Sequence, residues 1–481
     1  MSKSNQRVDR CAEARVAART GSRGSNSRGF ATALVMWAVA VAAITLAGLQ
    51  IVAARQSAAG REALGRVRAQ WAARAGVEAV IARLSSEAGQ AQPLGATSLL
   101  KDLATVAEGR LDRAGYRVGH ETAAGLMPGP SDAHAKLNVN LMSVDDLMLL
   151  PGMSEDIAES IVDWIDADDT PQLSGAEVET YVGLTSPYRP RNGPVRSLAE
   201  LERVKGVDPL TLRGEDWNLN GWLDANENDG DLSWPPDSAD GKLDAGWSAI
   251  ITGDSVTLPF NTQGLATLDL VTTEASQLEA ELGVSSEQAQ TLVAYATGDA
   301  PNMAEFIRTP LSQLAAQLQR DGRLTLTQPR GTGGRGGRGG RGGGATGQVQ
   351  VPDLTSEQLS ALIERTTVVE AAALRPGKLN LNTCDEATLE YLSVVTPTVR
   401  DGLLALRDSK GGDIEKFMDL LDAQGMDSAT LAGLFAVLEV RSSVFVVTSR
   451  GRDAASGVEV EMTASVDRSA DPVVIRSMVV R

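Results

Sequence analysis

An uncharged apolar run stands near the N-terminus of the chain. It extends from Phe30 to Ala54, which gives 25 residues without a charged side chain. As a helix with a rise of about 1.5 Å per residue, the run would be about 37 Å long, enough to cross a hydrocarbon core about 30 Å thick. The pattern predicts one transmembrane helix at residues 30–54.

Apolar residues continue at helical spacing after residue 54, now interleaved with arginine and glutamate. Examples are Leu64, Trp71, Val77, Val80 and Leu84. The spacing predicts that an amphipathic helix prolongs the transmembrane segment. It fits the stalk of a pilin fold, half packed on a globular domain, and equally any juxtamembrane helix.

Alternating apolar and polar residues, typical of β-strands, occur near both ends of the remaining chain. One group of short strands falls within residues 115–140, and a second group falls at residues 443–449, 458–466 and 473–480. The residues between the two groups are typical of helices and loops. The sequence therefore predicts an α+β protein whose antiparallel sheet is interrupted by a large, mainly helical insertion.

The insertion contains an internal sequence repeat. Lys136–Asn140 (KLNVN) recurs as Lys378–Asn382 (KLNLN), and each copy precedes a predicted helix. The stretches 147–164 and 198–207 resemble helix-hairpin-helix units, with weaker versions at 265–296 and 389–406. Such units often bind DNA phosphates through backbone N–H groups at a glycine turn. Here Ser154 replaces the second glycine and two acidic residues follow it, so we expect packing modules and no nucleic-acid binding.

Charge and cysteine content narrow the possible partners. The formal net charge is −17, and residues 155–247 carry 21 acidic against 7 basic residues. This region would repel a phosphate backbone and attract hard cations. The cysteines are Cys11 and Cys384, so removal of an N-terminal leader would leave one thiol and no intramolecular disulfide.

The junction at Gly29 and Phe30 resembles a prepilin processing site. Residues 1–29 carry seven basic and two acidic residues, and the apolar run starts directly after Gly29. The resemblance implies cleavage after Gly29 and methylation of Phe30; the alternative is an uncleaved signal anchor. Leu34 would be the fifth mature residue, where most pilin-like subunits carry a glutamate. Its lack of charge is characteristic of one pseudopilin family, the general secretion pathway protein K family.

Further residues resemble the helical domain of the same family: Asp166–Asp169, Tyr181, Tyr188–Arg189 and Asn192–Pro194. The resemblance implies a non-enzymatic minor pseudopilin at the tip of the type II secretion pseudopilus, which initiates its assembly and supports protein export across the outer membrane. The implied partners are the other minor pseudopilins of the tip complex, the prepilin peptidase and the inner-membrane secretion platform. The implied location is the bacterial inner membrane, spanned once, with the C-terminal domain in the periplasm.

One stretch matches the twelve-residue calcium loop position by position. Side-chain oxygens fall at positions 1, 3, 5, 9 and 12, and Gly221 stands at position 6, where the loop turns sharply. Alternate residues of such a curling loop point inward, so hard oxygens can surround one ion. We predict a structural Ca²⁺ ion, with a solvated Asn/Asp-rich loop as the alternative. The expected ligands are Asp216, Asn218, Asn220, the backbone carbonyl of Trp222, Asp224 and Glu227.

A weaker match follows at residues 240–244. Asp240 and Asp244 fit the pattern, but a proline at residue 236 occupies an earlier ligand position, so Asp237 would have to substitute for it. We therefore consider Asp237, Asp240 and Asp244 as a second candidate calcium site.

These signals divide the chain into seven parts. After the leader at 1–29 and the transmembrane helix at 30–54, residues 55–140 form the stalk and the first part of a pilin-like domain. The insertion comprises a helical part with the calcium loop at 141–329, a Gly/Arg linker at 330–350 and a second helical part at 351–440. Residues 441–481 supply the closing strands. RNA binding is an alternative for the linker, but a flexible spacer suits an exported chain better.

Nucleophile–base motifs, metalloprotease motifs and phosphate-binding loops are absent from the sequence, and its two histidines stand outside recognisable motifs. We therefore expect no enzymatic activity. Two alternatives to the pseudopilin remain: a membrane-anchored DNA-uptake receptor that uses the helix-hairpin-helix units, and a calcium-binding adhesin on a pilus-like anchor.

Overall fold

The computed structural model describes residues 26–88, 94–122, 125–257, 267–326, 350–368, 375–469 and 472–481. The leader, up to residue 25, and nearly all of the Gly/Arg linker lie outside these ranges. The chain divides into two compact units, residues 1–67 and 68–481.

The described part of the first unit is the N-terminal portion of helix α2 (Asn26–Ala88). Within the described residues, one helix is long and apolar enough to cross a membrane, with a mean hydropathy of 2.2 in its most apolar window and none of that window buried. Phe30 and Leu34 both lie exposed on it. These side chains have no protein core to pack against, as expected of a helix whose apolar surface faces lipid or other helices.

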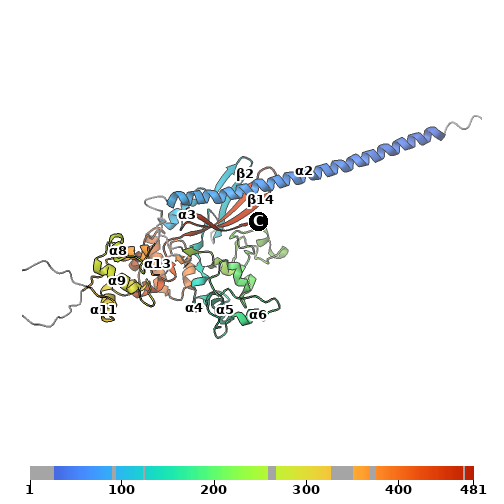
Figure 1. Ribbon diagram of the computed structural model, residues 1–481. Helices are drawn as coiled ribbons and strands as arrows, with labels where there is room; N and C mark the ends of the chain where they lie inside the picture. The colour runs from blue at the N-terminus through green and yellow to red at the C-terminus, as the bar shows by residue number, and fades with distance from the viewer. Residues whose placement is uncertain are drawn as a thin grey trace, which may run out of the picture. The chain divides into compact units, whose positions relative to one another are not determined.

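The second unit contains an antiparallel sheet made from both ends of the chain. Its main path runs β1-β2-β13-β14-β15, with β3 paired to β2 and β4 to β13. The bounds are β1 Glu108–Leu111, β2 Ala114–Thr122, β3 Gly125–Pro128, β4 Ser131–Asp132, β13 Val444–Asp453, β14 Glu459–Asp467 and β15 Val474–Val480. The C-terminal part of α2 lies along this sheet near β2 and β14 (Figure 1). The α+β prediction and the interrupted sheet are confirmed.

Two glycines allow α2 to approach the sheet closely. A Cβ atom at Gly451 of β13 would lie 2.0 Å from the carbonyl oxygen of Ala69, and one at Gly76 of α2 would lie 2.2 Å from Oγ of Ser449. The core between them combines α2, α3 (Ala96–Ala104), β2, β13 and β14, and includes Val77, Val80, Leu84, Leu99, Leu103, Val118, Phe445, Val447 and Met462. The helical spacing of α2 therefore does place one apolar face on the sheet, although Trp71 remains 69 % exposed.

The insertion forms two further cores. The first joins residues 137–251 to residues 379–440 and also includes Ala304 and Ile307, and the second lies within residues 268–368. The helices are α4 Val144–Leu147, α5 Glu155–Ile165, α6 Val178–Val182, α7 Pro209–Arg213, α8 Ala275–Leu282, α9 Ser286–Ala296, α10 Glu305–Arg308, α11 Leu311–Arg320, α12 Ser356–Arg365, α13 Pro397–Ser409 and α14 Ser428–Leu434. The 3-10 helices are η1 Ala133–Ala135, η2 Val139–Leu141, η3 Leu198–Arg203, η4 Ala225–Glu227, η5 Gly230–Leu232, η6 Gly246–Ala249, η7 Glu386–Tyr391 and η8 Phe417–Asp422.

Short two-stranded ladders pair segments of the insertion that lie far apart in the sequence. Three are parallel, between β5 and β6, β8 and β9, and β11 and β12, and one is antiparallel, between β7 and β10. Their bounds are β5 Leu137–Asn138, β6 Ile251–Thr252, β7 Val256–Thr257, β8 Leu268–Asp269, β9 Thr366–Thr367, β10 Arg375–Pro376, β11 Leu379–Asn380 and β12 Leu438–Glu439. The two copies of the KLN motif thus supply β5 and β11, each the opening strand of a module.

Candidate metal centre

The predicted calcium loop is an excursion whose two ends touch. It leaves α7 at Gly214 and returns at Gly246, the first residue of η6, and both glycines have positive φ (55° and 52°). A Cβ atom at Gly214 would lie 2.1 Å from the carbonyl oxygen of Asp244, so only glycine fits there. The loop is therefore held at its base by backbone packing.

Within the loop, backbone N–H groups surround the two terminal carboxylates. Asp216 accepts hydrogen bonds from the N–H groups of Asn220 and Gly221, each at 2.9 Å. Glu227 accepts from the N–H groups of Trp217 and Asp224, each at 3.0 Å. These bonds curl the chain so that the first and last predicted ligands belong to one closed network.

The middle ligands join the same network. The amide groups of Asn218 and Asn220 donate to Oδ2 of Asp224 at 2.7 and 3.1 Å. The indole of Trp222 packs against the guanidinium of Arg450, 4.3 Å from its ring centroid. The structure thus brings Asp216, Asn218, Asn220, Asp224 and Glu227 into one hydrogen-bonded unit.

The acidic loop is charged and buried at once. Asp216 is 3 % exposed and Glu227 is 1 % exposed. Burial, together with the charges of Asp216 and Asp224, raises the pKa of Glu227 to about 7, and burial also raises the pKa of Asp216. Among the described residues, no ion pair involves Asp216 or Glu227. The all-oxygen, acidic donor set therefore fits a hard cation such as Ca²⁺.

Residues from the distant sheet complete the surroundings of the loop. Arg450 of β13 pairs with Asp224 and also with Glu461 of β14 at 2.9 Å, and Glu461 accepts from the Asn220 amide at 3.0 Å. Thr448 donates to the Asn220 carbonyl at 2.9 Å. Sequence reasoning missed Arg450 and Glu461 because more than 220 residues separate them from the loop.

At the second candidate calcium site, backbone N–H groups already bond to the three carboxylates. The carboxylate of Asp237 accepts three backbone N–H bonds, from Asp229, Gly230 and Ala239, at 3.0, 2.8 and 2.7 Å. Burial works against its ionisation, but these bonds lower the pKa of Asp237. Asp240 and Asp244 lie exposed, and each accepts a backbone N–H bond two residues further along the chain. These bonds already explain the three carboxylates as turn-forming groups.

Buried Glu215, which sequence reasoning also missed, ties the two parts of the excursion together. Its carboxylate accepts from the N–H groups of Ser238 and Asp244 at 2.8 and 3.0 Å. Glu215 directly precedes Asp216, so these two hydrogen bonds connect the first part of the excursion to the second.

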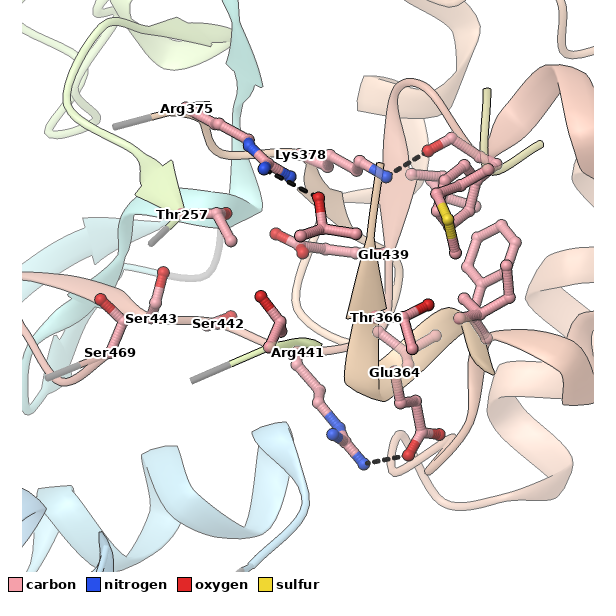
Figure 2. Close-up of a pocket in the computed structure, with 18 of the residues that line it drawn as sticks. Thr257, Glu364, Thr366, Arg375, Lys378, Glu439, Arg441, Ser442, Ser443 and Ser469 are labelled. Carbon is pink, nitrogen blue, oxygen red and sulfur yellow. Dashed lines mark hydrogen bonds and ion pairs between the residues drawn. The ribbon is translucent and has the colours of Figure 1, made fainter. Parts of the chain in front are cut away.

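Only the two histidines could supply imidazole nitrogen to a metal. His134 is instead engaged in contacts within the fold. His134 is fully buried, and its ring nitrogens lie 3.0 Å from the Lys378 carbonyl and from Oγ of Ser443. It also pairs with Glu439 at 2.6 Å. Glu439 faces a cavity of about 300 Å³ that Arg375, Lys378 and Ser442 also line (Figure 2). This cavity lies at the junction between the sheet and the second copy of the KLN motif.

Gly29 and Phe30 lie exposed in the first unit near the start of α2. The single described cysteine, Cys384, is buried and free, and burial raises its pKa to about 12.

Comparison with known proteins shows what this chain is similar to. Residues 129–214 match the family model described as type II secretion system, protein K. A stretch of 91 residues is 34 % identical to the type II secretion system protein K of Pectobacterium carotovorum subsp. carotovorum, covering 19 % of this chain and 26 % of that protein. The matched stretch therefore spans about a quarter of the relative's length.

A solved structure is also similar: a complex of GspK, GspI and GspJ from the type 2 secretion system of enterotoxigenic Escherichia coli. The match has a TM-score of 0.45 and 12 % identity, and it covers 88 % of this chain and 99 % of that one.

Both sequence matches are to protein K of type II secretion systems. The family model matches the module that follows β4, and this module is what resembles the protein K family. The family resemblance predicted from the helical module is confirmed, and Leu34 lies outside the residues that the family model matches.

Proposed function

We propose that this chain is a non-enzymatic minor pseudopilin at the tip of a type II secretion pseudopilus, where it initiates assembly and supports protein export across the outer membrane. The observation that carries the proposal is the packing of α2 on a sheet built from both chain ends. Helix α2 thereby supplies both an apolar segment that lipid can surround and one side of the core of a water-exposed domain. Such a subunit can leave the membrane and join a helical filament without refolding.

The place where the insertion leaves the sheet supports a position at the tip. Strand β13 runs antiparallel to α2: Arg68 lies 3.7 Å from Asp453, Gly76 packs on Ser449, and Glu87 lines the same cavity as Ser442. The insertion enters through β4 and returns just before β13. About 300 residues therefore emerge at the C-terminal end of α2. A further subunit stacked at that end would collide with them.

The uncharged Leu34 supports the same position. A carboxylate buried in lipid costs several kcal/mol unless it is paired. A subunit that is followed by no other at the tip needs no such pairing group. The prepilin peptidase would remove the leader after Gly29 and methylate Phe30, and the secretion platform would hold the single-pass subunit in the inner membrane with its C-terminal domain in the periplasm.

We further propose that the loop from Asp216 to Glu227 holds a structural Ca²⁺ ion. Burial of Asp216 and Glu227, neither of which forms an ion pair within the described ranges, supports this proposal. The loop bonds to β13 and β14 through Asn220, so an ion in it would fasten the helical insertion to the sheet. Calcium would thus stabilise the tip domain and would not act as a switch.

The environment of the first hairpin argues for packing and against DNA uptake. Gly152 provides the turn with φ of 70°, but Glu155 and Asp156 form the first turn of α5 directly after it. Two carboxylates at a helix N-terminus repel a phosphate where backbone N–H groups would otherwise attract it.

Co-purification tests the function. The tagged full chain is co-expressed with the other two minor pseudopilins of its tip complex and purified in detergent with calcium. We expect a stable complex, weakened by Trp71→Ala because this exposed aromatic side chain lies on α2, where a neighbouring helix would pack. Leu173→Ala, which alters a 96 % exposed side chain in the loop before α6, is the matched control and should leave the complex intact. Absence of any complex would contradict the proposal.

A further inference from the structure

The cavity of about 300 Å³ beside Glu439 lies where three parts of the second unit meet. The sheet contributes Ser443 and Ser469, which lie next to β13 and β14. The module that opens with β11 contributes Lys378 and Glu439, and the second core of the insertion contributes Met303. A cavity of this volume can hold a small molecule, and its lining indicates which kind.

One end of the cavity carries buried positive charge. Arg375 and Lys378 lie in the upper half of Figure 2 with Glu439, and the charges of the three side chains act on one another. Nζ of Lys378 donates to the Phe435 carbonyl and lies 3.6 Å from the centroid of the Phe435 ring. Lys378 forms no ion pair with a described residue, and burial lowers its pKa to about 8. An anionic group bound here would stabilise the charged lysine.

Glu439 places an acceptor without a donor at the same end. Nδ1 of His134 is directed at the Lys378 carbonyl, 3.0 Å away, so Oε1 of Glu439 accepts no hydrogen bond of good geometry although it lies 2.6 Å from that nitrogen. Oγ1 of Thr257, which also lines the cavity, is likewise buried without a hydrogen bond to a described residue. Buried polar atoms normally have a partner, so a ligand with a cationic donor would suit Glu439.

The charges at this end of the cavity are otherwise balanced. The charge of Asp132 stabilises protonated His134, and the charge of Asp269 stabilises the guanidinium of Arg375. One lysine and one carboxylate of the lining remain, and their charges are opposite. A ligand with a net charge would disturb this balance, whereas a zwitterion preserves it.

Another part of the lining is apolar. Phe417 and Phe435 pack edge to face with ring centroids 5.3 Å apart. They line the cavity together with Met303, Ile363, Leu438 and Val440. Lys378 lies on the ring of Phe435, so the charged end and the apolar wall adjoin. A ligand that fills the cavity would therefore carry its charges at one end and an apolar group at the other.

We propose that this cavity binds a small zwitterion with an apolar body, of which a free apolar α-amino acid is the simplest example. Its carboxylate would lie at Arg375 and Lys378, its ammonium group at Glu439, and its side chain against Phe417 and Phe435. A molecule with one charge alone would leave the opposite buried group unmatched, which is costly.

Such a ligand would join parts of the fold that are distant in sequence. Lys378 directly precedes β11 and Glu439 belongs to β12, whereas Thr257 belongs to β7 and Met303 to the second core of the insertion. Binding would stabilise the arrangement of these parts, because a ligand that binds only the folded chain raises its stability. The inference goes beyond the pseudopilin proposal, and neither depends on the other.

Calorimetric titration tests the proposal on the full chain, purified in detergent with calcium. The probe is L-leucine, and three relatives each lack one feature: N-acetyl-L-leucine lacks the ammonium group, L-leucinamide the carboxylate, and glycine the apolar body. We expect L-leucine to bind at least about tenfold more tightly than each relative, because each relative loses one set of contacts. No binding of L-leucine, or equal binding of any relative, would overturn the proposal.

Two variants assign the charged contacts. Glu439→Gln should bind L-leucine at least about tenfold more weakly and lose the preference for it over N-acetyl-L-leucine, and Lys378→Met should lose the preference over L-leucinamide. Glu364→Gln, at the cavity end where Glu364 pairs with Arg441 at 3.7 Å, and the exposed Lys410→Met are the matched controls and should keep both preferences. A purely structural role would weaken all four probes alike, and that result would overturn the assignment.

Discussion

Asn140 and Asn382 occupy the same position in two copies of one module. The amide oxygen of Asn140 accepts from the N–H of Val195 at 2.6 Å, and its nitrogen donates to the carbonyl of the same residue at 3.0 Å. Asn382 makes the matching pair with Ile414, at 2.9 Å in both directions. The sequence repeat is therefore a structural duplication, in which one asparagine fastens the residues just after the opening strand to a later segment.

Removing these asparagines should open the modules. We expect Asn382→Ala to lower the free energy of unfolding by about 3 kcal/mol, because it leaves buried backbone groups unsatisfied. Asn140→Ala should cost less, since Asn140 is only half-buried. Denaturant unfolding measures both losses, with the exposed Asn226→Ala as a control expected to change stability by less than about 0.5 kcal/mol. Equal effects for the control and Asn382→Ala would contradict this role.

The close contact between α2 and β13 gives a steric prediction. Gly451→Ala places a Cβ atom 2.0 Å from the Ala69 carbonyl oxygen, so α2 or β13 has to move. We expect a loss of about 3 kcal/mol, the upper end of the usual cost of overpacking. Gly433→Ala on α14 meets open space and should stabilise the protein slightly, because alanine favours helix. Thermal unfolding compares the two, and a neutral Gly451→Ala would refute the close approach.

Calcium should stabilise the chain through the acidic loop. We expect a chelator to lower the unfolding temperature of the native chain, and Asp216→Ala to abolish most of that response while removing one bound calcium in a calorimetric titration. Asp231→Asn, an exposed acid of the same excursion, should keep the native response. No heat of binding in the native chain would leave the loop as a solvated, hydrogen-bonded turn.

His134 predicts a dependence of stability on pH. Burial opposes its charge, but Glu439 outweighs burial and, with Asp132 and the Lys378 carbonyl, raises the pKa of His134 from 6.5 to about 9. This stabilisation is complete below pH 6.5 and is lost as the pH rises through about 9. From pH 6.5 to 8 we expect a loss of about 2 kcal/mol.

The control for this pH dependence is Glu439→Gln. Burial lowers the pKa of Lys378 to about 8, which acts in the opposite direction above that pH, and the raised pKa values of Glu227 and Glu177, about 7 each, add their own loss of stability at the lower end of the window. The difference between the native and Glu439→Gln profiles therefore isolates His134. Glu439→Gln should flatten the profile in this window. Parallel profiles for the two proteins would show that the pair does not carry the effect.

Local patterns predicted the parts of the molecule that depend on local geometry. The uncharged run after Gly29, the alternating strands and the oxygen spacing of the Asp216 loop all follow from periods along the chain. Contacts that depend on tertiary structure left no such pattern. Arg450 reaches Asp224 only because β13 lies beneath the loop, and Glu177 meets Asp163 only because an excursion folds back onto α5. Trp71 fits the apolar period of α2 and yet lies exposed, because the sheet covers only part of that helix.

The state of the N-terminus tests the central claim most directly. The full chain is expressed with its prepilin peptidase, recovered from membranes and measured by intact-mass spectrometry, with peptidase-free cells as the control. A minor pseudopilin should begin at Phe30, carry one added methyl group, and keep residues 1–29 only when the peptidase is absent. A chain that retains its leader in both cells, or that is cut elsewhere, would contradict the account.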